Sequence, residues 1–212
     1  MPSVQDNVSA LLGVVRGYLQ DRLNEIQTWD LNRVLIGNIA RADSLGTATD
    51  GTEHALSDAV VLTLVRTEED PTRKNQRNYR ANPLATDASD GILYRNPPVG
   101  LNLYLLITAN HQNYANALDI LSNVIAVFQQ RKNLTDDGVV TWPAGVLFGE
   151  RSLKFNLLSP TFEEENHLWS MLGGKQLPSV LYMVQTANVE MVPDQPTVGP
   201  PINQITLNES IY

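Results

Sequence analysis

The segment that most constrains the fold is the run of residues 96–110, NPPVGLNLYLLITAN. Pro97 and Pro98 lack backbone N–H groups and have a fixed φ, so they end whatever element precedes them. The residues that follow, 101–109, are almost all apolar and include types that favour a pleated surface. An apolar run of this length predicts a strand buried on both faces, and therefore the centre of a sheet.

Length and composition limit the possible classes of protein. A chain of 212 residues forms one domain, or at most two small ones. The absence of cysteine excludes disulfides and thiolate metal sites and fits synthesis in a reducing cytoplasm. The net charge of −8 argues against nucleic-acid binding, which depends on Lys and Arg neutralising phosphates. No apolar run approaches the ~20 residues that span a bilayer, so we expect no contact with a membrane.

Helical spacing and short apolar runs organise the N-terminal part of the chain. Apolar residues recur every three or four positions over residues 4–26, which predicts a long amphipathic helix capped by Ser3 and Asp6. Residues 33–40 and 59–65 are apolar runs of strand length, and their succession predicts an antiparallel pair.

Two polar stretches separate these elements from one another and from the buried strand. Residues 43–52 are rich in Gly, Thr, Asp and Ser, which predicts an exposed loop. Residues 68–90 are polar and poor in large apolar side chains. They predict a long connection, of a kind that is usually functional or mobile in compact domains.

The C-terminal half alternates strands and helices. Residues 114–131 have helical spacing, and residues 152–158 alternate polar and apolar types as a half-exposed strand does. Residues 162–172 predict a third helix, with acidic residues in its first turn and glycines at its end. Residues 180–185 predict the last strand, with an extension to about residue 192.

This order of elements predicts the fold class and the domain boundaries. We expect a single α/β domain over residues 1–192, with a mixed β-sheet flanked by helices rather than a regular doubly wound sheet. Residues 193–212 carry several prolines and predict an extended C-terminal tail or arm.

Glu164 and His167 form the best candidate for a metal or acid–base site. Their Glu-x-x-His spacing is used by di-iron carboxylate bundles, but those sites need two such pairs and further glutamates. Acidic residues in the first turn of a helix are favourable whatever their chemistry. Because no nucleophile elbow or His-Glu-x-x-His motif is present, we expect no catalytic residue, metal or cofactor. A metal-dependent enzyme centred on this pair remains an alternative.

Four basic residues cluster in the long polar stretch. In an otherwise acidic chain, so few positive charges are weak support for phosphate binding. They fit either a solvated loop or a docking surface for an acidic protein partner. The residues are Arg73, Lys74, Arg77 and Arg80.

Two segments resemble the signatures of a known family. The first is Asn-Pro-Pro followed by Leu-Asn-Leu-Tyr, and the second surrounds the third predicted helix. Both resemble cap, or tail-terminator, proteins of phage-tail-like contractile injection systems, the family of the N-terminal domain of the Photorhabdus virulence cassette cap protein. The residues that carry the likeness are Asn96, Pro97, Pro98, Asn102, Tyr104, Asn166, His167, Trp169, Gly173, Gly174 and Pro178.

The resemblance implies a structural role and a set of partners. Such proteins are similar in fold to phage tail terminators, which assemble as hexameric rings. The ring sits on the last disc of the inner tube, engages the last ring of the sheath, ends both polymers and anchors the sheath. The resemblance thus implies a homo-oligomer whose partners are the tube and sheath proteins. It also implies synthesis in the cytoplasm and a place in an assembled particle, which is released from the cell or stays in it. The structural alternative is another ring component, in the baseplate or the connector.

The signature residues themselves are expected to serve the fold. A buried Asn102 needs hydrogen-bond partners and is expected to tie its strand to the Pro-Pro turn, so Asn102→Leu should cost stability rather than recognition. Trp169 and Leu172 should seat the third helix on the sheet. In the tail, Ile202, Ile205 and Leu207 are expected to add a strand to a sheet edge of a neighbouring subunit, unless the tail is disordered.

Overall fold

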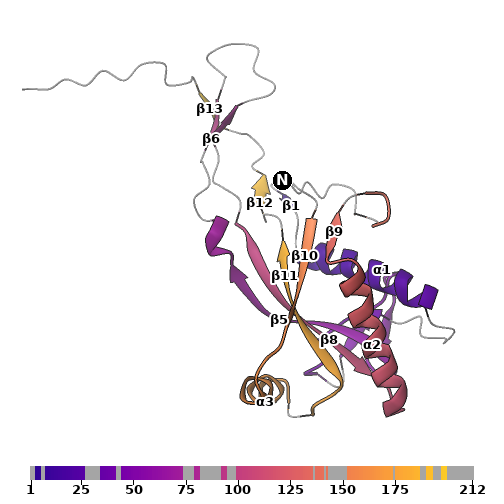
Figure 1. Cartoon of the computed structure of the whole chain (residues 1–212). Coiled ribbons are helices and arrows are strands. Elements are labelled where there is room, and N and C mark those ends of the chain that lie inside the picture. The colour runs from indigo at the N-terminus through magenta and orange to yellow at the C-terminus, as the bar shows by residue number, and fades with distance from the viewer. Residues whose placement is uncertain are drawn as a thin grey trace, which may run out of the picture.

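The chain, seen in a computed structural model, folds around one eight-stranded sheet with helices on both faces (Figure 1). Two helices, α1 (Val8–Ile26) and α2 (Tyr114–Gln130), cover one face, and α3 (Phe162–Met171) packs on the other. The structure describes residues 3–5, 8–26, 34–41, 44–73, 79–81, 92–94, 99–135, 137–140, 142, 152–173, 175–186, 190–192 and 197–199.

The large sheet has the strand order β4-β3-β2-β5-β8-β11-β10-β9, in which only β2 and β5 run parallel. This arrangement confirms the predicted mixed sheet flanked by helices. Its strands are β2 (Val34–Ile36), β3 (Leu45–Thr47), β4 (Glu53–Ala55), β5 (Ala59–Glu69), β8 (Leu101–Asn110), β9 (Asn133–Thr135), β10 (Ser152–Leu158) and β11 (Ser179–Thr186).

Strand β8 lies in the interior of the sheet, as its apolar sequence predicts. It pairs antiparallel with β5 on one side and with β11 on the other. Leu103, Leu105 and Ile107 belong to the core beneath α1 and α2, whereas Leu106 belongs to the cluster beneath α3. Because side chains alternate along a strand, these two sets lie on opposite faces, and both faces are covered.

Aromatic side chains join α2 to the strands beneath it. The ring of Phe128 on α2 stacks on Phe155 of β10, with centroids 4.4 Å apart, and lies 5.2 Å from the ring of Tyr182 on β11. At the other end of the helix, the side chain of Asn113 accepts a hydrogen bond from the backbone N–H of Ala115. This cap explains why α2 begins at residue 114, as its sequence predicts.

The first helix starts later than its sequence pattern predicts. Ser3–Gln5 forms strand β1, which pairs antiparallel with β12 (Glu190–Val192), so α1 begins at Val8 and Ser3 does not cap it. The reason is that pairing with a segment distant in sequence outweighs a local propensity for helix, which is worth only tenths of a kcal/mol per residue.

Strands β2 and β5 are parallel, so the prediction of an antiparallel pair is wrong. No single tight turn joins β2 to β5, because the hairpin of β3 and β4 lies between them in the sequence, so the two strands need not be antiparallel. Residues 43–52 therefore contain a strand, β3, where a loop was predicted. Strand β3 needs a glycine at position 46, because a Cβ there would lie 2.7 Å from the Leu56 side chain and 2.8 Å from that of Leu35.

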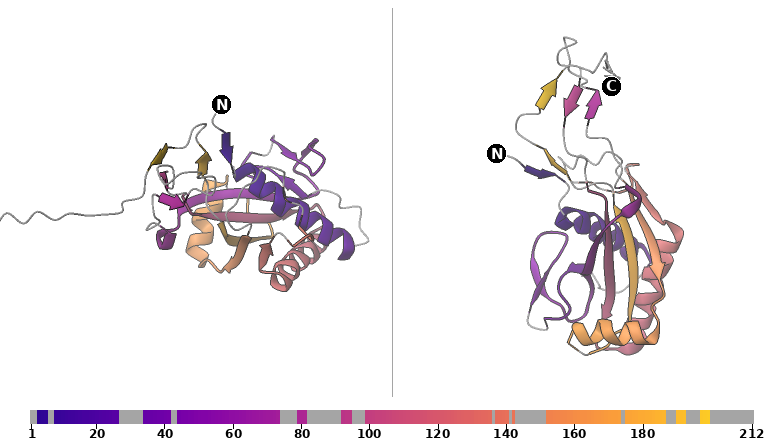
Figure 2. Two further views of the ribbon diagram at one scale, coloured as in Figure 1. Left: turned by 90° about the horizontal axis from the view of Figure 1, so that it is seen from above. Right: turned by 90° about the vertical axis from the view of Figure 1, so that its left-hand side faces the viewer.

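The polar stretch after β5 is also partly regular. It contains the short helix η1 (Pro71–Arg73) and strand β6 (Tyr79–Ala81), which joins β7 (Ile92–Tyr94) and β13 (Thr197–Gly199) in a second sheet. This small sheet lies at the opposite end of the molecule from α3 (Figure 2). The last strand of the large sheet, β11, ends at Thr186, so the predicted extension to residue 192 is instead the separate strand β12.

No helix in the described part of the chain has the length and apolar character needed to cross a bilayer.

Candidate assembly surfaces

Helix α3 begins with a capping box in which Glu164, one of the two candidate metal ligands, takes part. The backbone N–H of Glu164 donates to the Thr161 hydroxyl, and the Glu164 carboxylate accepts from the Thr161 N–H at 2.8 Å. The backbone hydrogen bond from Thr161 is also the main reason why the pKa of Glu164 is lowered. His167 is exposed, and no group of three His, Cys, Asp or Glu side chains among the described residues is placed to hold a metal ion.

The same helix is seated on the sheet by Leu168 and Trp169. Both are buried, and they pack with Leu106 of β8, while Leu172 lies partly buried beside them. This confirms the expected packing of Trp169 and Leu172. Asn166, by contrast, is exposed, so it is available at the surface rather than built into the core.

The chain turns from α3 into the last strand as its glycines predict. Gly173 has φ +100°, a left-handed conformation that favours glycine and ends the helix. Gly174 lies outside the described residues. The carbonyl of Pro178 then accepts a hydrogen bond from the N–H of Ala109 at 2.9 Å, which joins the start of β11 to the end of β8.

Tyr104 of β8 forms a polar cluster with Glu68 and Arg66 of β5 on the α3 face of the sheet. Its hydroxyl donates a hydrogen bond to Glu68 of β5 at 2.8 Å, and the guanidinium of Arg66 lies 5.5 Å from the centroid of its ring. The hydrogen bond to Glu68 is the main cause that raises the pKa of the Tyr104 phenol. This cluster ties the two central strands together across their shared face.

Asn102 lies on the same face of the sheet and is buried. The residue is 8 % exposed, and its Oδ1 accepts no hydrogen bond within the part of the chain that the structure describes. Asn96, Pro97 and Pro98, to which we expected it to bind, lie outside the described residues. The expected tie from Asn102 to the Pro-Pro turn therefore stays a prediction.

A groove of about 460 Å³ lies between α3 and the open part of this face. Its lining includes Tyr104, Leu158, His167 and Met171, and the last of these is 74 % exposed. The lining also includes Ser159 and Glu164, and the Glu164 carboxylate already accepts hydrogen bonds in the capping box of α3. The groove therefore suits contact with a partner protein better than acid–base chemistry.

Among the described strands, β4 and β9 form the two edges of the sheet, and β9 pairs with only part of β10. Strand β9 pairs with β10 only from Ser152 to Lys154. The N–H of Phe155 donates outward to the carbonyl of Lys132, so by alternation the N–H and C=O of Leu157 also face outward. No described strand pairs with them there, and Leu157 is 51 % exposed. We call residues 156–158 the free edge of β10.

An apolar stripe on α2 runs beside this edge. Tyr114, Leu118, Leu121 and Ile125 recur at intervals of four and three residues, which places them on one side of the helix. Tyr114 is 66 % and Leu118 is 41 % exposed, and the other two are half-buried. The same spacing continues to Phe128, which stacks on β10, so the stripe lies on the β10 side of α2.

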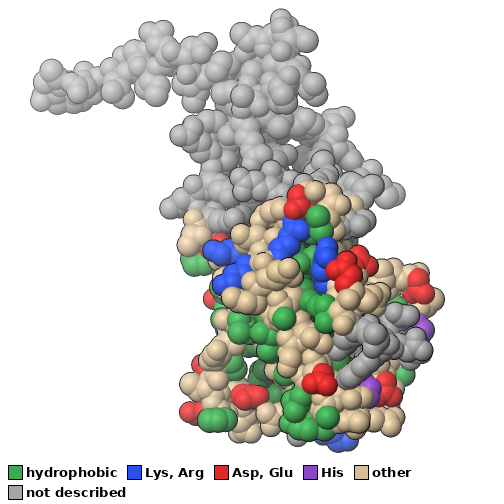
Figure 3. All heavy atoms as spheres, turned by 45° about the vertical axis from the view of Figure 1, so that its right-hand side comes forward, with side chains coloured by type: hydrophobic (Ala, Val, Ile, Leu, Met, Phe, Trp, Pro, Cys, Tyr) green, Lys and Arg blue, Asp and Glu red, His purple; other side chains and the backbone are tan. Residues whose placement is uncertain are grey.

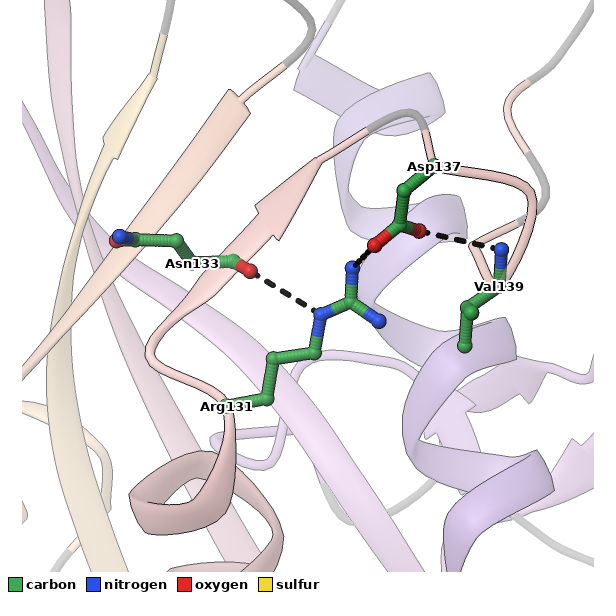
Figure 4. A network of polar contacts seen from close by, with 4 residues as sticks. All are labelled: Arg131, Asn133, Asp137 and Val139. Atoms are coloured by element: carbon green, nitrogen blue, oxygen red, sulfur yellow. Dashed lines mark hydrogen bonds and ion pairs between the residues drawn. The ribbon is translucent and has the colours of Figure 1, made fainter.

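The paired half of the edge is held by a network at the end of α2. Arg131 donates from Nε to the carbonyl of Asn133 at 3.2 Å and forms an ion pair with Asp137 (Figure 4). The carboxylate of Asp137 also accepts from the N–H of Val139, which is the main reason why its pKa is lowered. These contacts fold the loop after β9 back onto the helix. Figure 3 shows that this part of the surface carries both charged and hydrophobic side chains.

The predicted partner contacts fall mostly outside these surfaces. Arg73 ends η1 and Arg80 lies in β6, at the small sheet. Lys74 and Arg77 lie outside the described residues, as do Ile202, Ile205 and Leu207. The structure therefore leaves the basic cluster and the tail as predictions from the sequence.

The fold is similar to that of two solved proteins from contractile injection systems. The chain aligns over 98 % of its length with the sheath/tube terminator of an extracellular contractile injection system, PVC, in its extended state, with a TM-score of 0.59 and 14 % identity. It aligns over 98 % with the tube-terminating cap of the anti-feeding prophage, again with a TM-score of 0.59, at 15 % identity. The alignments span 65 % and 63 % of those chains, so this chain is less than two thirds of their length.

The chain belongs to the Pvc16 N-terminal domain family, whose sequence profile matches residues 10–204. This confirms the family that the two signature segments indicate. A comparison with curated proteins finds no match.

The free edge of β10 and the stripe on α2 were not identified from the sequence. The stripe does have a signal, because Leu118, Leu121 and Ile125 have helical spacing, but burial in a core gives the same pattern. Only the packing of α2 shows that half of the stripe is left at the surface.

Proposed function

We propose that this protein caps the distal end of the inner tube and sheath of a phage-tail-like contractile injection particle. Membership of the Pvc16 N-terminal domain family over most of the chain carries the proposal. The likeness in fold to a sheath/tube terminator and to a tube-terminating cap supports it. The role is structural and non-enzymatic, because the one metal-like pair has its carboxylate in a capping box.

In this role the protein forms a closed ring, six-membered as the family resemblance implies, and stops both polymers from growing. A ring of identical subunits needs two different surfaces that meet head to tail. The open sheet edge, the groove beside α3 and the apolar stripe are unmatched surfaces of the kind that such contacts require. Tube and sheath proteins are the partners, and the ring joins the particle after synthesis in the cytoplasm.

The deciding experiment is tube growth with and without this protein. The cognate inner-tube protein is polymerised alone and with increasing amounts of the full chain, and tube lengths and end structures are measured by electron microscopy. We expect shorter tubes that carry a ring at one end. Tubes of unchanged length with bare ends would exclude capping, and rings at the baseplate end would instead favour the baseplate or connector role.

The tail and the basic cluster are proposed to contact neighbouring subunits. Residues 193–212 act as an arm, and Arg73, Lys74, Arg77 and Arg80 face an acidic partner. Truncation before Pro193 keeps β12 and removes the arm together with strand β13 of the small sheet, so truncation after Gly199, which keeps β13, is tested beside it. We expect both to weaken ring formation and sheath binding; unchanged rings and sheath binding would show that the arm has no role in assembly.

A further inference from the structure

We propose that residues 203–208 of a second copy of this chain add a strand to the free edge of β10. The proposal rests on the proposed function, since it requires copies of the chain to meet side by side. It specifies which surface receives the tail and which copy supplies it.

The acceptor is an edge whose backbone groups face outward beside an apolar side chain. The N–H and C=O of Leu157 face outward and pair with no described strand. An edge of this kind is a template for another strand, and soluble proteins usually block it with charge, Pro or a covering element. Here Leu157 itself is apolar and half exposed, and Leu158 follows it.

The other edge of the sheet is a poorer acceptor. Strand β4 consists of Glu53, His54 and Ala55, so it offers a charged residue and no large apolar side chain. Beside the free edge of β10, by contrast, the stripe on α2 exposes Tyr114 and Leu118. A strand added to β10 would cover both the open backbone and this apolar surface.

The sequence of the tail fits this position. In residues 203–208, NQITLN, Ile205 and Leu207 are two apart, and polar residues alternate with them. In a strand, Ile205 and Leu207 would point to one face and Gln204, Thr206 and Asn208 to the other. With the apolar pair toward α2, the polar side chains lie on the open face of the sheet.

In the same copy, the start of the tail lies away from this edge. Three residues lie between Gly199, the end of β13, and residue 203, and this stretch spans at most ~14 Å when fully extended. Strand β13 lies beyond the Ser152 end of β10, at the opposite end of the molecule from α3 (Figures 1 and 2). The path along β10 from Ser152 to Leu157 alone is ~16 Å. We therefore assign the strand to another copy, and the single-chain disulfide described below separates the two sources.

Cysteine linking tests the contact directly, because the natural chain contains no cysteine. Purified full-length Leu157→Cys protein is mixed with Leu207→Cys protein and oxidised gently, and mixed dimers are quantified on non-reducing gels. Ile205→Cys is tested in parallel, because a register shift of two residues keeps the same face. We expect either tail variant to give several-fold more mixed dimer with Leu157→Cys than with Leu45→Cys, a matched control on the opposite half of the sheet that is 55 % exposed.

Equal linking to Leu45→Cys and Leu157→Cys would overturn the proposal. So would a disulfide that closes within one chain when Leu157→Cys and Leu207→Cys are combined in the same molecule. Both results are read from the size of the linked product, and neither depends on whether the protein caps tubes.

A pair of proline variants tests the backbone contact. Leu157→Pro removes an N–H that faces the open edge, whereas Asn156→Pro removes one that faces β11. We expect Leu157→Pro to keep the melting temperature within a few degrees but to lose assembled mass in light scattering, and Asn156→Pro to unfold more easily. Normal assembly of Leu157→Pro would overturn the proposal. If the cysteine variants do not link but the protein still shortens tubes, the capping function stands and strand donation is wrong. If the cysteine variants link but the protein does not cap tubes, the proposed function is rejected and the contact between copies stands.

Discussion

The ring of Phe128 on α2 stacks on that of Phe155 on β10, with centroids 4.4 Å apart and planes inclined by 20°. This contact joins the helix to the outermost long strand of the sheet. It also fixes which side of α2 carries the apolar stripe, because the stripe residues lie on the same side of the helix as Phe128. These residues are Tyr114, Leu118, Leu121 and Ile125. The stacked pair therefore positions the free edge and the stripe as one surface.

Removing this aromatic pair should destabilise the fold strongly. Phe155 is buried against Phe128 and Tyr182, so we expect Phe155→Ala to lower the free energy of unfolding by about 3–5 kcal/mol, as truncation of a packed aromatic does. Urea unfolding followed by fluorescence measures the change. Phe162→Ala is the matched control: Phe162 is 92 % exposed, so its truncation should change stability by less than about 0.5 kcal/mol. Equal losses for the two variants would contradict the packing described above.

The cap of α3 gives a smaller, specific effect. Thr161→Ala removes the hydroxyl that accepts from the Glu164 N–H, and we expect it to cost about 1 kcal/mol of unfolding free energy. Thr161→Ser retains the hydroxyl and should recover most of the loss. Thermal unfolding at neutral pH compares the two; if serine gives no recovery, the hydroxyl is not the source of the effect.

Glu164 should contribute to stability in a pH-dependent way. Hydrogen bonds from Thr161 lower the pKa of Glu164 in the folded state below its unfolded value. Its contribution is therefore present above the unfolded pKa, near 4.5, and is lost as pH falls through the folded pKa. We expect Glu164→Gln to reduce the fall of the melting temperature between about pH 5 and pH 3. If Glu164→Gln leaves the fall of the melting temperature at low pH unchanged, the Glu164 carboxylate does not accept these hydrogen bonds in solution.

Tyr182 should affect stability at the alkaline end. Burial raises its pKa from 10.0 to about 12 in the folded protein. Because the folded state holds the proton more tightly, the contribution is complete below pH 10 and is lost as pH rises toward 12. Tyr182→Phe should flatten the decline of the melting temperature across this window. Tyr114→Phe, at an exposed position, is the control and should leave the slope unchanged.

Asn102→Leu now has a different expected outcome from that suggested by the sequence. Since the buried Oδ1 accepts no hydrogen bond from the described residues, removing it should leave the melting temperature unchanged or higher. A marked loss of stability would restore the original expectation of a structural tie. If the variant is stable but fails to assemble, Asn102 is retained for a partner, which light scattering and tube capping would reveal.

Several elements were predictable because their local sequence agrees with their environment. The buried strand at residues 101–109, the helix after Asn113 and the helix after Thr161 all have the expected type and nearly the expected limits. In each, a cap or a continuous apolar run specifies the element without help from distant segments. The two family signatures lie on these same elements, which is why the family could be identified.

Other features were decided by contacts between distant parts of the chain. Ser3–Gln5 is a strand because Glu190–Val192 pairs with it, and β2 pairs parallel with β5 although β3, the next strand in the sequence, pairs antiparallel with β2. Neither contact leaves a local pattern in the sequence. The same holds for Asn102, whose surroundings depend on strands more than thirty residues away in either direction.

The sequence by itself determined the family, the class of fold and the central strand, because these follow from local propensity and apolar pattern. The tertiary structure alone decided which apolar residues stay at the surface. Leu157 and Leu118 have the same pattern as their buried neighbours, yet both are exposed. Leu157 lies beyond the last residue of β10 that pairs with β9. Burial depends on what packs against a side chain, and that information lies in the fold rather than in the spacing of residues.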